Sequence, residues 1–268
     1  MDNDQRQQPL SSRQFARELR ALGVTTAPDG LLPAVLGELG LADSFFAIAS
    51  QLGPLLIAYN DHGIAAVGRG EDSEAFVANY RIRSGRLLRK TPTPPAALSQ
   101  AIARRLRGER AELRFDLRGL SEFERATLLK ATEIPRGEIR PYAWIAREIG
   151  RPGAVRAVGS ALGRNPIPLL IPCHRIIRSD GLIGDYVFGN ATKREILSAE
   201  GLVPDEIEQQ ARARIRYLAS DTTGIYCFPT CHNARRITEP HRVTFASDAA
   251  AQAAGYRPCK VCRPAIAS

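Results

Sequence analysis

The chain has 268 residues, and its net charge of +9 and pI of about 9.7 favour an anionic partner such as nucleic acid, with a solvated basic surface as the alternative. A hydrophobic content of 44% is sufficient for a packed core, in one large domain or two to three small ones. No stretch is apolar enough or long enough to span a bilayer, which argues against a membrane-spanning helix.

Residues 1–41 are predicted to form a helical extension of two short helices. Phe15, Leu19 and Leu22 have helical spacing, and a second apolar series follows at residues 32–39. The N-terminal residues "MDNDQRQQPLSSRQ" are polar and lack the apolar core of a signal peptide. We therefore expect a cytoplasmic protein without a membrane partner, in which cysteines stay reduced.

Residues 42–118 are predicted to form an α/β subdomain. Three apolar runs are broken at Gly53-Pro54 and at residues 60–63, as in strands joined by hairpin turns. Helices are expected at 72–83 and at 97–107, on either side of the Pro-rich connector "TPTPP".

Residues 119–202 are predicted to be mostly helical. "PYAWIAREIG" begins with a proline at the first helical position and ends with a glycine cap, and a second helix is expected from Pro152 to Asn165-Pro166. Two short helices around a glycine-centred turn form a helix-turn-helix, although many such pairs are only structural. Outward-facing arginines favour nucleic acid: Arg147, Arg151, Arg156 and Arg164.

Residues 203–209 are polar, include Pro204, and are predicted to be a linker. A strand-like "RIRYLA" then leads into the cysteine-rich segment 210–268. We find no internal repeat.

Five cysteines divide into one plus four. Cys173 stands alone. It is a nucleophile, a metal ligand or a buried core thiol, and each of these roles implies a different function for the protein. Its neighbours are Pro172 and His174, and Asn165-Pro166 precedes it by one short predicted strand. Because successive side chains of an extended chain point to opposite faces, His174 activates Cys173 only if the chain turns sharply or a water bridges them. Glu200, at the end of a predicted helix, is the candidate to orient the imidazole.

At these residues the chain resembles the O6-alkylguanine-DNA alkyltransferases. The resemblance rests on "RAVGSALGRNP", "IPCHRII" and "GDYVFGNATKREILSAEG", and covers roughly residues 42–201. It implies an α/β plus α fold, with a ribonuclease-H-like subdomain followed by a helical alkyltransferase domain that contains a helix-turn-helix. It also implies direct-reversal repair of O6-alkylguanine in double-stranded DNA, with O4-alkylthymine as a further candidate substrate.

The resemblance implies these roles residue by residue. Cys173 accepts the alkyl group, His174 deprotonates it through a water, Glu200 holds the imidazole, and Asn165 braces the turn. Tyr142 gives a proton or a hydrogen bond to the guanine leaving group, and Tyr186 lines the base pocket. Arg156 fills the space that the flipped nucleotide leaves, with its helix in the minor groove. Arg151 and Arg164 are further candidates for DNA contact. No organic cofactor is expected, and each molecule acts once because a thioether is not hydrolysed.

Three positions depart from the family pattern. Glu124 and Leu128 stand where glutamine and an aromatic residue are usual, and Val187 where some members carry a small or polar residue. These departures bear on substrate range and DNA contacts rather than on the nucleophile. A related class of lesion-binding proteins keeps the fold but lacks the cysteine, and Cys173 argues against that assignment.

The remaining four cysteines have the spacing C-x3-C-x27-C-x2-C: Cys227, Cys231, Cys259 and Cys262. Two such pairs predict one tetrahedral Zn2+ site, and two disulfides, the alternative, are disfavoured in a reducing compartment. A purely structural zinc module is the default interpretation, since a segment this short needs a metal or another cross-link to fold stably.

The segment from "DTTGIYCFPTCHNARR" to "RPCKVCRP" resembles the zinc domain of the Ada adaptive-response protein. That resemblance implies that Cys227 accepts a methyl group from a DNA phosphotriester. Ada carries this module at its N-terminus, before an AraC-type regulatory domain, whereas here the module is C-terminal. This different order argues against transcriptional activation. A methylation sensor that regulates transcription stays as the alternative to a second repair site. A monomer is expected, because one lesion needs one thiol.

Overall fold

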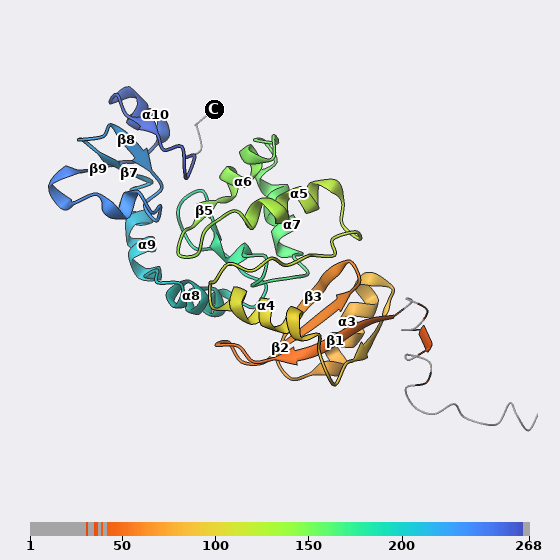
Figure 1. Cartoon of the computed structure of the whole chain (residues 1–268). Coiled ribbons are helices and arrows are strands. Elements are labelled where there is room, and N and C mark those ends of the chain that lie inside the picture. Colours follow the sequence, from red (N-terminus) through yellow and green to blue (C-terminus); the bar gives the residue numbers. More distant parts are fainter. Residues whose placement is uncertain (1–30, 32–34, 37–38, 40–41, 265–268) are drawn as a thin grey trace, which may run out of the picture.

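The computed structural model describes residues 31, 35–36, 39 and 42–264. The helical extension predicted for residues 1–41 lies outside the described residues except at those four positions. Figure 1 shows three parts: a sheet with two helices, a central group of helices, and a small C-terminal sheet drawn in blue. The protein is thus mixed α/β, as predicted. No helix of the described residues combines the length and the apolar character that crossing a membrane demands.

The first part is a four-stranded sheet of order β3-β2-β1-β4. Strands β1 to β3 pair antiparallel and β4 runs parallel to β1, so the predicted hairpins are confirmed. The two predicted helices are present as well. The elements are β1 (Ala42–Ile48), β2 (Leu55–Asn60), β3 (Gly63–Arg69), α3 (Ser73–Ser84), β4 (Leu87–Lys90) and α4 (Ala96–Leu106).

Strand β3 at the edge of this sheet supports the central part. The Val67 amide donates to the Pro166 carbonyl at 2.8 Å, and Arg69 Nη1 donates to Thr192 Oγ1 at 2.8 Å. These two bonds hold the turn around residue 166 and the helix that contains Thr192 against the sheet.

A buried polar network ties β1 to α3 and to the residue that precedes β4. Asp43 is 1% exposed, accepts from the Tyr80 hydroxyl, and accepts from Arg86 Nε and Nη2 at 2.9 and 2.8 Å. A buried carboxylate needs all its donors, because each one lost leaves a charge poorly solvated.

We expect Tyr80→Phe to destabilise the protein by about 1–3 kcal/mol, because Asp43 then loses a buried donor. Urea unfolding monitored by circular dichroism measures this loss. Tyr59→Phe, on β2 of the sheet, is the control, because among the described residues its hydroxyl makes one long bond of 3.5 Å, to Thr91. Equal stabilities of the two variants would contradict the expectation.

The central part contains five helices among the described residues and one short parallel strand pair. Its elements are α5 (Glu122–Ala131), β5 (Arg140–Pro141), α6 (Tyr142–Glu148), α7 (Val155–Gly163), the 3-10 helix η1 (Cys173–Arg175), β6 (Ile176–Ile177) and α8 (Asn190–Ala199). Strands β5 and β6 pair parallel, which places the start of α6 beside the segment that follows η1.

Three predicted details of this part are corrected. Pro141 is the N-cap of α6 rather than its first residue, and α7 begins at Val155 because residues 152–153 form a turn. The strand predicted before Cys173 is a turn closed by an isolated bridge between Pro168 and Ile171. In this turn Leu169 has a φ of 72°, which is incompatible with a continuous strand.

The predicted linker at 203–209 is instead helical. Helix α9 (Pro204–Arg212) begins with Pro204 at its first turn, where a proline loses no hydrogen bond, and it buries Ile207 and Ala211. The proline that suggested a break therefore starts a helix, and α9 joins the central part to the blue sheet in Figure 1.

The C-terminal part, residues 217–264, is a sheet of order β10-β8-β7-β9 with one α-helix and two 3-10 helices. Its elements are β7 (Tyr217–Ser220), β8 (Ile225–Cys227), the 3-10 helices η2 (Ala234–Arg236) and η3 (Glu239–His241), β9 (Arg242–Phe245), α10 (Asp248–Ala253) and β10 (Arg257–Pro258). One cluster of buried residues runs from the first sheet through Trp144 and Cys173 to all four C-terminal cysteines. The three parts therefore share a core.

Candidate active site and metal centre

Cys173 is the first residue of η1 and is 6% exposed. Its sulfur accepts a hydrogen bond of 3.1 Å from Asn165 Nδ2. The same amide group donates to the Ile171 carbonyl at 3.1 Å, while Asn165 Oδ1 accepts from the Ile167 amide at 2.9 Å. Asn165 thus fixes both the turn and the sulfur that the turn presents.

His174 follows Cys173 within the same turn of 3-10 helix, so the sharp bend that activation demands is present. Its Nε2 lies 3.0 Å from Glu200 Oε1. Burial lowers the pKa of His174, so the ring is neutral near pH 7 and Nε2 carries the proton that faces the carboxylate. The buried Nδ1 has no hydrogen-bond partner among the residues that the structure describes. It is left as a free proton acceptor.

Glu200 caps the C-terminal end of α8 and is held by several donors. Arg175 donates from Nε at 2.9 Å and from Nη2 at 2.7 Å, and the Gly137 amide donates at 3.2 Å. Burial alone would raise the pKa of Glu200, but the hydrogen bonds from His174 and Arg175 outweigh it and lower that pKa to about 2. The carboxylate is therefore ionised over the whole neutral range.

The low pKa of Glu200 predicts an acid-sensitive contribution to stability. Its stabilisation is complete above the unfolded-state pKa, near 4.5, and is lost as pH falls toward about 2. We expect Glu200→Gln to be about 2–4 kcal/mol less stable than the parent chain at pH 7, and this difference to shrink below pH 4.5. Urea unfolding of both chains between pH 7 and 3.5 tests this. A difference that stays constant with pH would contradict it.

Lys193 lies close enough to Cys173 for their charges to interact. It is fully buried on α8, and its Nζ donates to the Ile176 and Ile183 carbonyls at 2.6 and 2.7 Å. Burial raises the pKa of the Cys173 thiol, whereas the Asn165 hydrogen bond and the Lys193 charge act against this rise. Burial also lowers the pKa of Lys193 to about 8, so it remains mostly a cation at neutral pH. The resting sulfur is a thiol next to groups that favour its anion.

Two predicted tyrosines lie at the same centre. Tyr142 is the first residue of α6, and burial together with the charge of nearby Cys173 raises its pKa, so it is a neutral phenol able to donate. The ring of Tyr186 meets the ring of His174 edge to face, with 6.1 Å between centroids. Both residues flank the Cys173–His174 turn.

The predicted arginines lie apart from this centre. Arg156 is exposed on α7 and Arg151 is exposed in the turn before it. Arg164 is exposed as well, but its guanidinium pairs with Glu124 at 2.8 Å, which offsets its charge. Position 124, one of the departures noted in the sequence, thus binds an arginine of the same surface.

The four C-terminal cysteines converge. All four are buried, and their sulfur atoms lie within 4.8 Å of one another. Tetrahedral Zn2+ with Zn–S bonds of about 2.3 Å needs sulfurs about 3.8 Å apart, so four thiolates here fit the ion. Asn233 Nδ2 adds a hydrogen bond of 3.4 Å to Cys259 Sγ, which supports the charge of the sulfurs.

Cys227 also lines a pocket of about 370 Å3, and none of the other three cysteines is among the lining residues. The polar lining residues are Ser220, Thr222, Thr223, Asn233, Arg236, Thr238 and His241.

Comparison with known proteins divides the chain in the same way. Residues 122–202 match the family described as 6-O-methylguanine DNA methyltransferase, DNA binding domain, and residues 208–265 match the metal binding domain of Ada. A methylated-DNA–protein-cysteine methyltransferase of Mycolicibacterium paratuberculosis is 46% identical over 89 residues, which are 33% of this chain and 53% of that protein. The chain thus spans about half the length of that relative.

The methylated-DNA–protein-cysteine methyltransferase of Salmonella typhimurium is 33% identical over 159 residues, which are 58% of this chain and 93% of that protein. The chain belongs to the methylated-DNA–protein-cysteine methyltransferases. A solved structure similar to this chain is Mycobacterium tuberculosis OGT in complex with DNA, which is 30% identical, with a TM-score of 0.49 over 59% of this chain and 93% of that one.

The C-terminal part of this chain holds a single zinc site. The match to the metal binding domain of Ada and the convergence of Cys227, Cys231, Cys259 and Cys262 support the same ligand set. The predicted cofactor is thereby confirmed.

Two residues at the Cys173 centre were not predicted from the sequence. Arg175 binds Glu200 with two nitrogens and also donates to the Ile134 carbonyl at 2.7 Å. Lys193 was the second, and a signal for it exists: it lies three and four residues before Ile196 and Leu197, on the buried face of α8. A lysine on an apolar helix face needs buried hydrogen-bond acceptors, and this pattern indicates a buried cation with a specific role.

Proposed function

We propose that this chain repairs DNA by direct reversal, moving an alkyl group from O6 of guanine to Sγ of Cys173. The observation that carries the proposal is a buried thiol beside a neutral His174 whose Nδ1 is free to accept a proton. O6-methylguanine is the proposed substrate, and O4-alkylthymine is a second candidate.

The reaction is a displacement at carbon. The Cys173 proton passes to His174 Nδ1, through one bridging water, and Glu200 stabilises the resulting imidazolium. The sulfur then forms a bond to the alkyl carbon while the bond from that carbon to O6 breaks. The electron pair leaves on guanine, which takes a proton from Tyr142, and Tyr142 regains one from solvent. The thioether product is stable, so each chain acts once.

Reaching O6 requires the base to leave the duplex. We propose that α6 and α7 form a helix-turn-helix that binds double-stranded DNA in the minor groove, with Arg156 taking the place of the flipped nucleotide and Tyr186 lining the base pocket. The exposure of Arg156 and Arg151 supports this role, as does the edge contact of Tyr186 with His174. Arg164 is the weaker candidate, because Glu124 already pairs with it.

The domain division follows from the same proposal. Residues 42–118 form a ribonuclease-H-like subdomain, and the sheet order with a final parallel strand supports this. Residues 119–202 form the alkyltransferase domain, and residues from 210 onward the Ada-type zinc domain. We propose that the chain acts as a monomer.

A second acceptor is proposed at Cys227, for the methyl group of a DNA phosphotriester. The pocket that Cys227 lines, with Arg236 and His241 in its wall, supports access to this sulfur. When bound, zinc keeps the four sulfurs as thiolates. A thiolate cluster repels an intact phosphodiester but not a neutral triester. The methyl carbon would move from phosphate oxygen to Cys227 Sγ, leaving the phosphodiester anion.

Peptide mass mapping tests both acceptors at once. The full chain is incubated with duplexes that carry either O6-methylguanine or a methyl phosphotriester, and cysteine peptides are analysed. We expect a methyl group on the Cys173 peptide from the first duplex and on the Cys227 peptide from the second. An unmodified Cys173 peptide with excess O6-methylguanine duplex overturns the main proposal. An unmodified Cys227 with full zinc content leaves the zinc module purely structural.

A further inference from the structure

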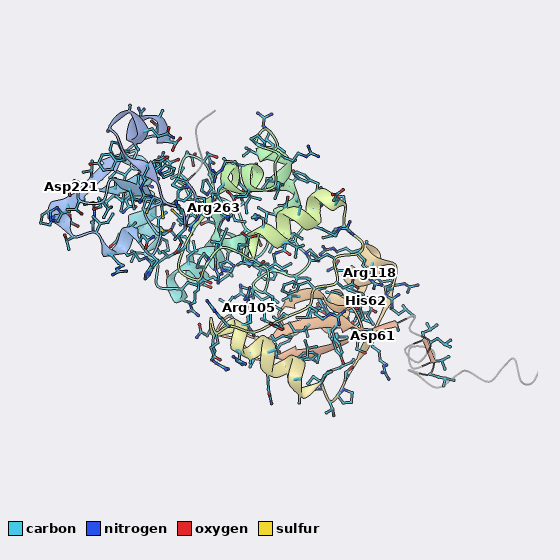
Figure 2. The ribbon with its side chains drawn as sticks, turned by 45° about the horizontal axis from the view of Figure 1, so that its top comes forward. Asp61, His62, Arg105, Arg118, Asp221 and Arg263 are labelled. Atoms are coloured by element: carbon cyan, nitrogen blue, oxygen red, sulfur yellow. The ribbon has the colours of Figure 1, made fainter. Side chains whose placement is uncertain are left out.

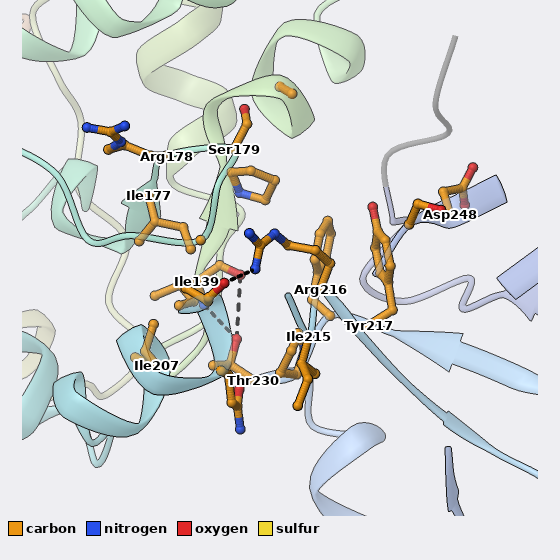
Figure 3. A pocket seen from close by; sticks show the side chains of 18 of the residues that line it. Ile139, Ile177, Arg178, Ser179, Ile207, Ile215, Arg216, Tyr217, Thr230 and Asp248 are labelled. Carbon is orange, nitrogen blue, oxygen red and sulfur yellow. Dashed lines mark hydrogen bonds between the residues drawn. The ribbon is translucent and has the colours of Figure 1, made fainter. Parts of the chain in front are cut away.

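The zinc module, residues 217–264, is docked on residues 133–148 of the alkyltransferase part. Its first docking loop runs from Thr230 to Arg235 along residues 137–139. Thr230 Oγ1 accepts from the Ile139 amide at 3.0 Å, and Figure 3 shows this contact beside the pocket of about 470 Å3 that both parts line. The His232 amide donates to Glu138 Oε1 at 2.9 Å, and Arg235 Nη2 donates to the Gly137 carbonyl.

The second docking loop carries Cys262 and Arg263. The Cys262 carbonyl accepts from Trp144 Nε1 at 3.0 Å, and the Arg263 carbonyl accepts from Arg147. The Arg263 guanidinium lies 2.9 Å from Glu148 and 5.7 Å from the centre of the Trp144 ring. Figure 2 shows Arg263 where the blue part meets the green helices.

Between the loops lies a buried ion pair. Glu138 and Arg140 are 4% and 2% exposed, and they bind each other. The Arg140 guanidinium lies 5.9 Å from the ring centre of Trp144 and 5.2 Å from that of Phe228 in the zinc module. The docked module adds the Phe228 ring beside Arg140 and the His232 amide donor to Glu138, so docking completes the surroundings of this buried pair.

Each docking loop contains a zinc ligand. Cys231 lies in the first loop and Cys262 in the second, whereas Cys227 lines its own pocket and is absent from both loops. The four-sulfur cluster therefore joins the two loops that hold Gly137, Glu138 and Trp144. Among the described residues no disulfide joins these loops, because all five cysteines are free thiols, so the metal would be their link.

Gly137 connects this interface to the active site. Its carbonyl accepts from Arg235, and its amide donates to Glu200 Oε2 at 3.2 Å. Gly137 has a φ of 72°, and a Cβ there would lie 2.9 Å from the Glu200 carbonyl and 3.4 Å from Arg235. Arg235, Gly137, Glu200 and His174 thus form one hydrogen-bonded series that ends at the neighbour of Cys173.

We propose that the docked zinc module supports the O6-alkylguanine site, with Arg235 as a positioning residue for the Glu200–His174 pair. The inference rests on the proposed function of Cys173. Docking sets the position of Gly137, and the Gly137 amide is one of two donors to Oε2 of Glu200, with Arg175 Nε as the other. Removing the Arg235 contact frees this loop, so Glu200 holds the imidazole less well and the proton of Cys173 is transferred more slowly.

The test compares Arg235→Ala with Arg257→Ala in the full chain. Arg257 is an exposed arginine of the same module outside both docking loops, so both variants lose one positive charge. We expect Arg235→Ala to transfer the methyl group in the preformed DNA complex about tenfold more slowly, the scale of one hydrogen bond that supports a charged group. Its affinity for unmodified duplex and its zinc content should match those of Arg257→Ala. Arg235→Lys should recover part of the rate.

Docking itself has a separate readout, because Trp144 is the only tryptophan of the chain. It is 3% exposed, so release of the module shifts its fluorescence to longer wavelength. A parent-like rate for Arg235→Ala overturns the proposal, whatever the Trp144 emission. So does a slower reaction explained wholly by weaker DNA binding, which would make the module an added DNA contact. A parent chain that transfers nothing refutes the proposed function of Cys173 instead.

Discussion

The Cys173→Ser chain is expected to lose O6-methylguanine transfer by at least about 10³-fold, the scale seen when a catalytic nucleophile is removed. An alcohol stays protonated where a thiol is ionised by a neutral imidazole, so His174 cannot activate a serine in this apolar turn. The serine is smaller than cysteine and still accepts a hydrogen bond from Asn165, so the fold should be retained. Single-turnover repair of a labelled O6-methylguanine duplex measures the loss.

Two controls accompany this variant. Cys173→Ala removes the nucleophile altogether, and the serine and alanine chains should be equally inactive. Thermal unfolding and binding of unmodified duplex should match the parent chain, which separates chemistry from folding and DNA affinity. Repair that persists in Cys173→Ala would show that the acceptor of the base alkyl group lies elsewhere.

Removing zinc is expected to unfold the C-terminal module. Its strands are too short to hold by themselves, since β8 has three residues and β10 has two. Structural zinc sites contribute about 10 kcal/mol or more to such modules. A chelator should therefore abolish amide protection throughout residues 217–264 and make four thiols reactive. Hydrogen exchange read by mass spectrometry, together with thiol titration, follows both changes.

The first sheet provides the internal control for zinc removal. Peptides from β1 to β3 share no ligand with the metal and should keep their protection. The amides of residues 137–148 should exchange faster, because their docking partners are lost. Full protection of residues 217–264 after metal removal would mean that the module folds on its own.

The parts of the site that the sequence predicted are those encoded in short segments. Because Cys173 and His174 are adjacent in the sequence, His174 can activate Cys173 only if the chain turns there, and the 3-10 helix provides this turn. Glu200 follows from the length of α8, which returns the chain to His174. The four cysteines follow from their spacing, because each pair can bind one side of a metal ion. The roles of these residues remain predictions that the experiments above address.

The interface between the parts could not be predicted from the sequence. Its hydrogen bonds join residues far apart in the chain, such as Trp144 with Cys262 and Arg235 with Gly137. In both, the acceptor is a backbone carbonyl, which every residue type offers, so the pattern leaves no trace in composition or spacing. The helix at 204–212 was missed for a related reason: Pro204 suggests a break, and only its place at the first turn makes it a helix start.

The buried Glu138–Arg140 pair has a consequence for truncated versions of this protein. A chain ended after residue 202 would uncover both charges and the indole of Trp144, and would leave the Ile139 amide without its acceptor. Such a fragment would also expose apolar surface that the module covers, including Ile139, and is therefore an unreliable substitute for the intact protein. The sequence boundary between the two matched families is therefore not a place to cut.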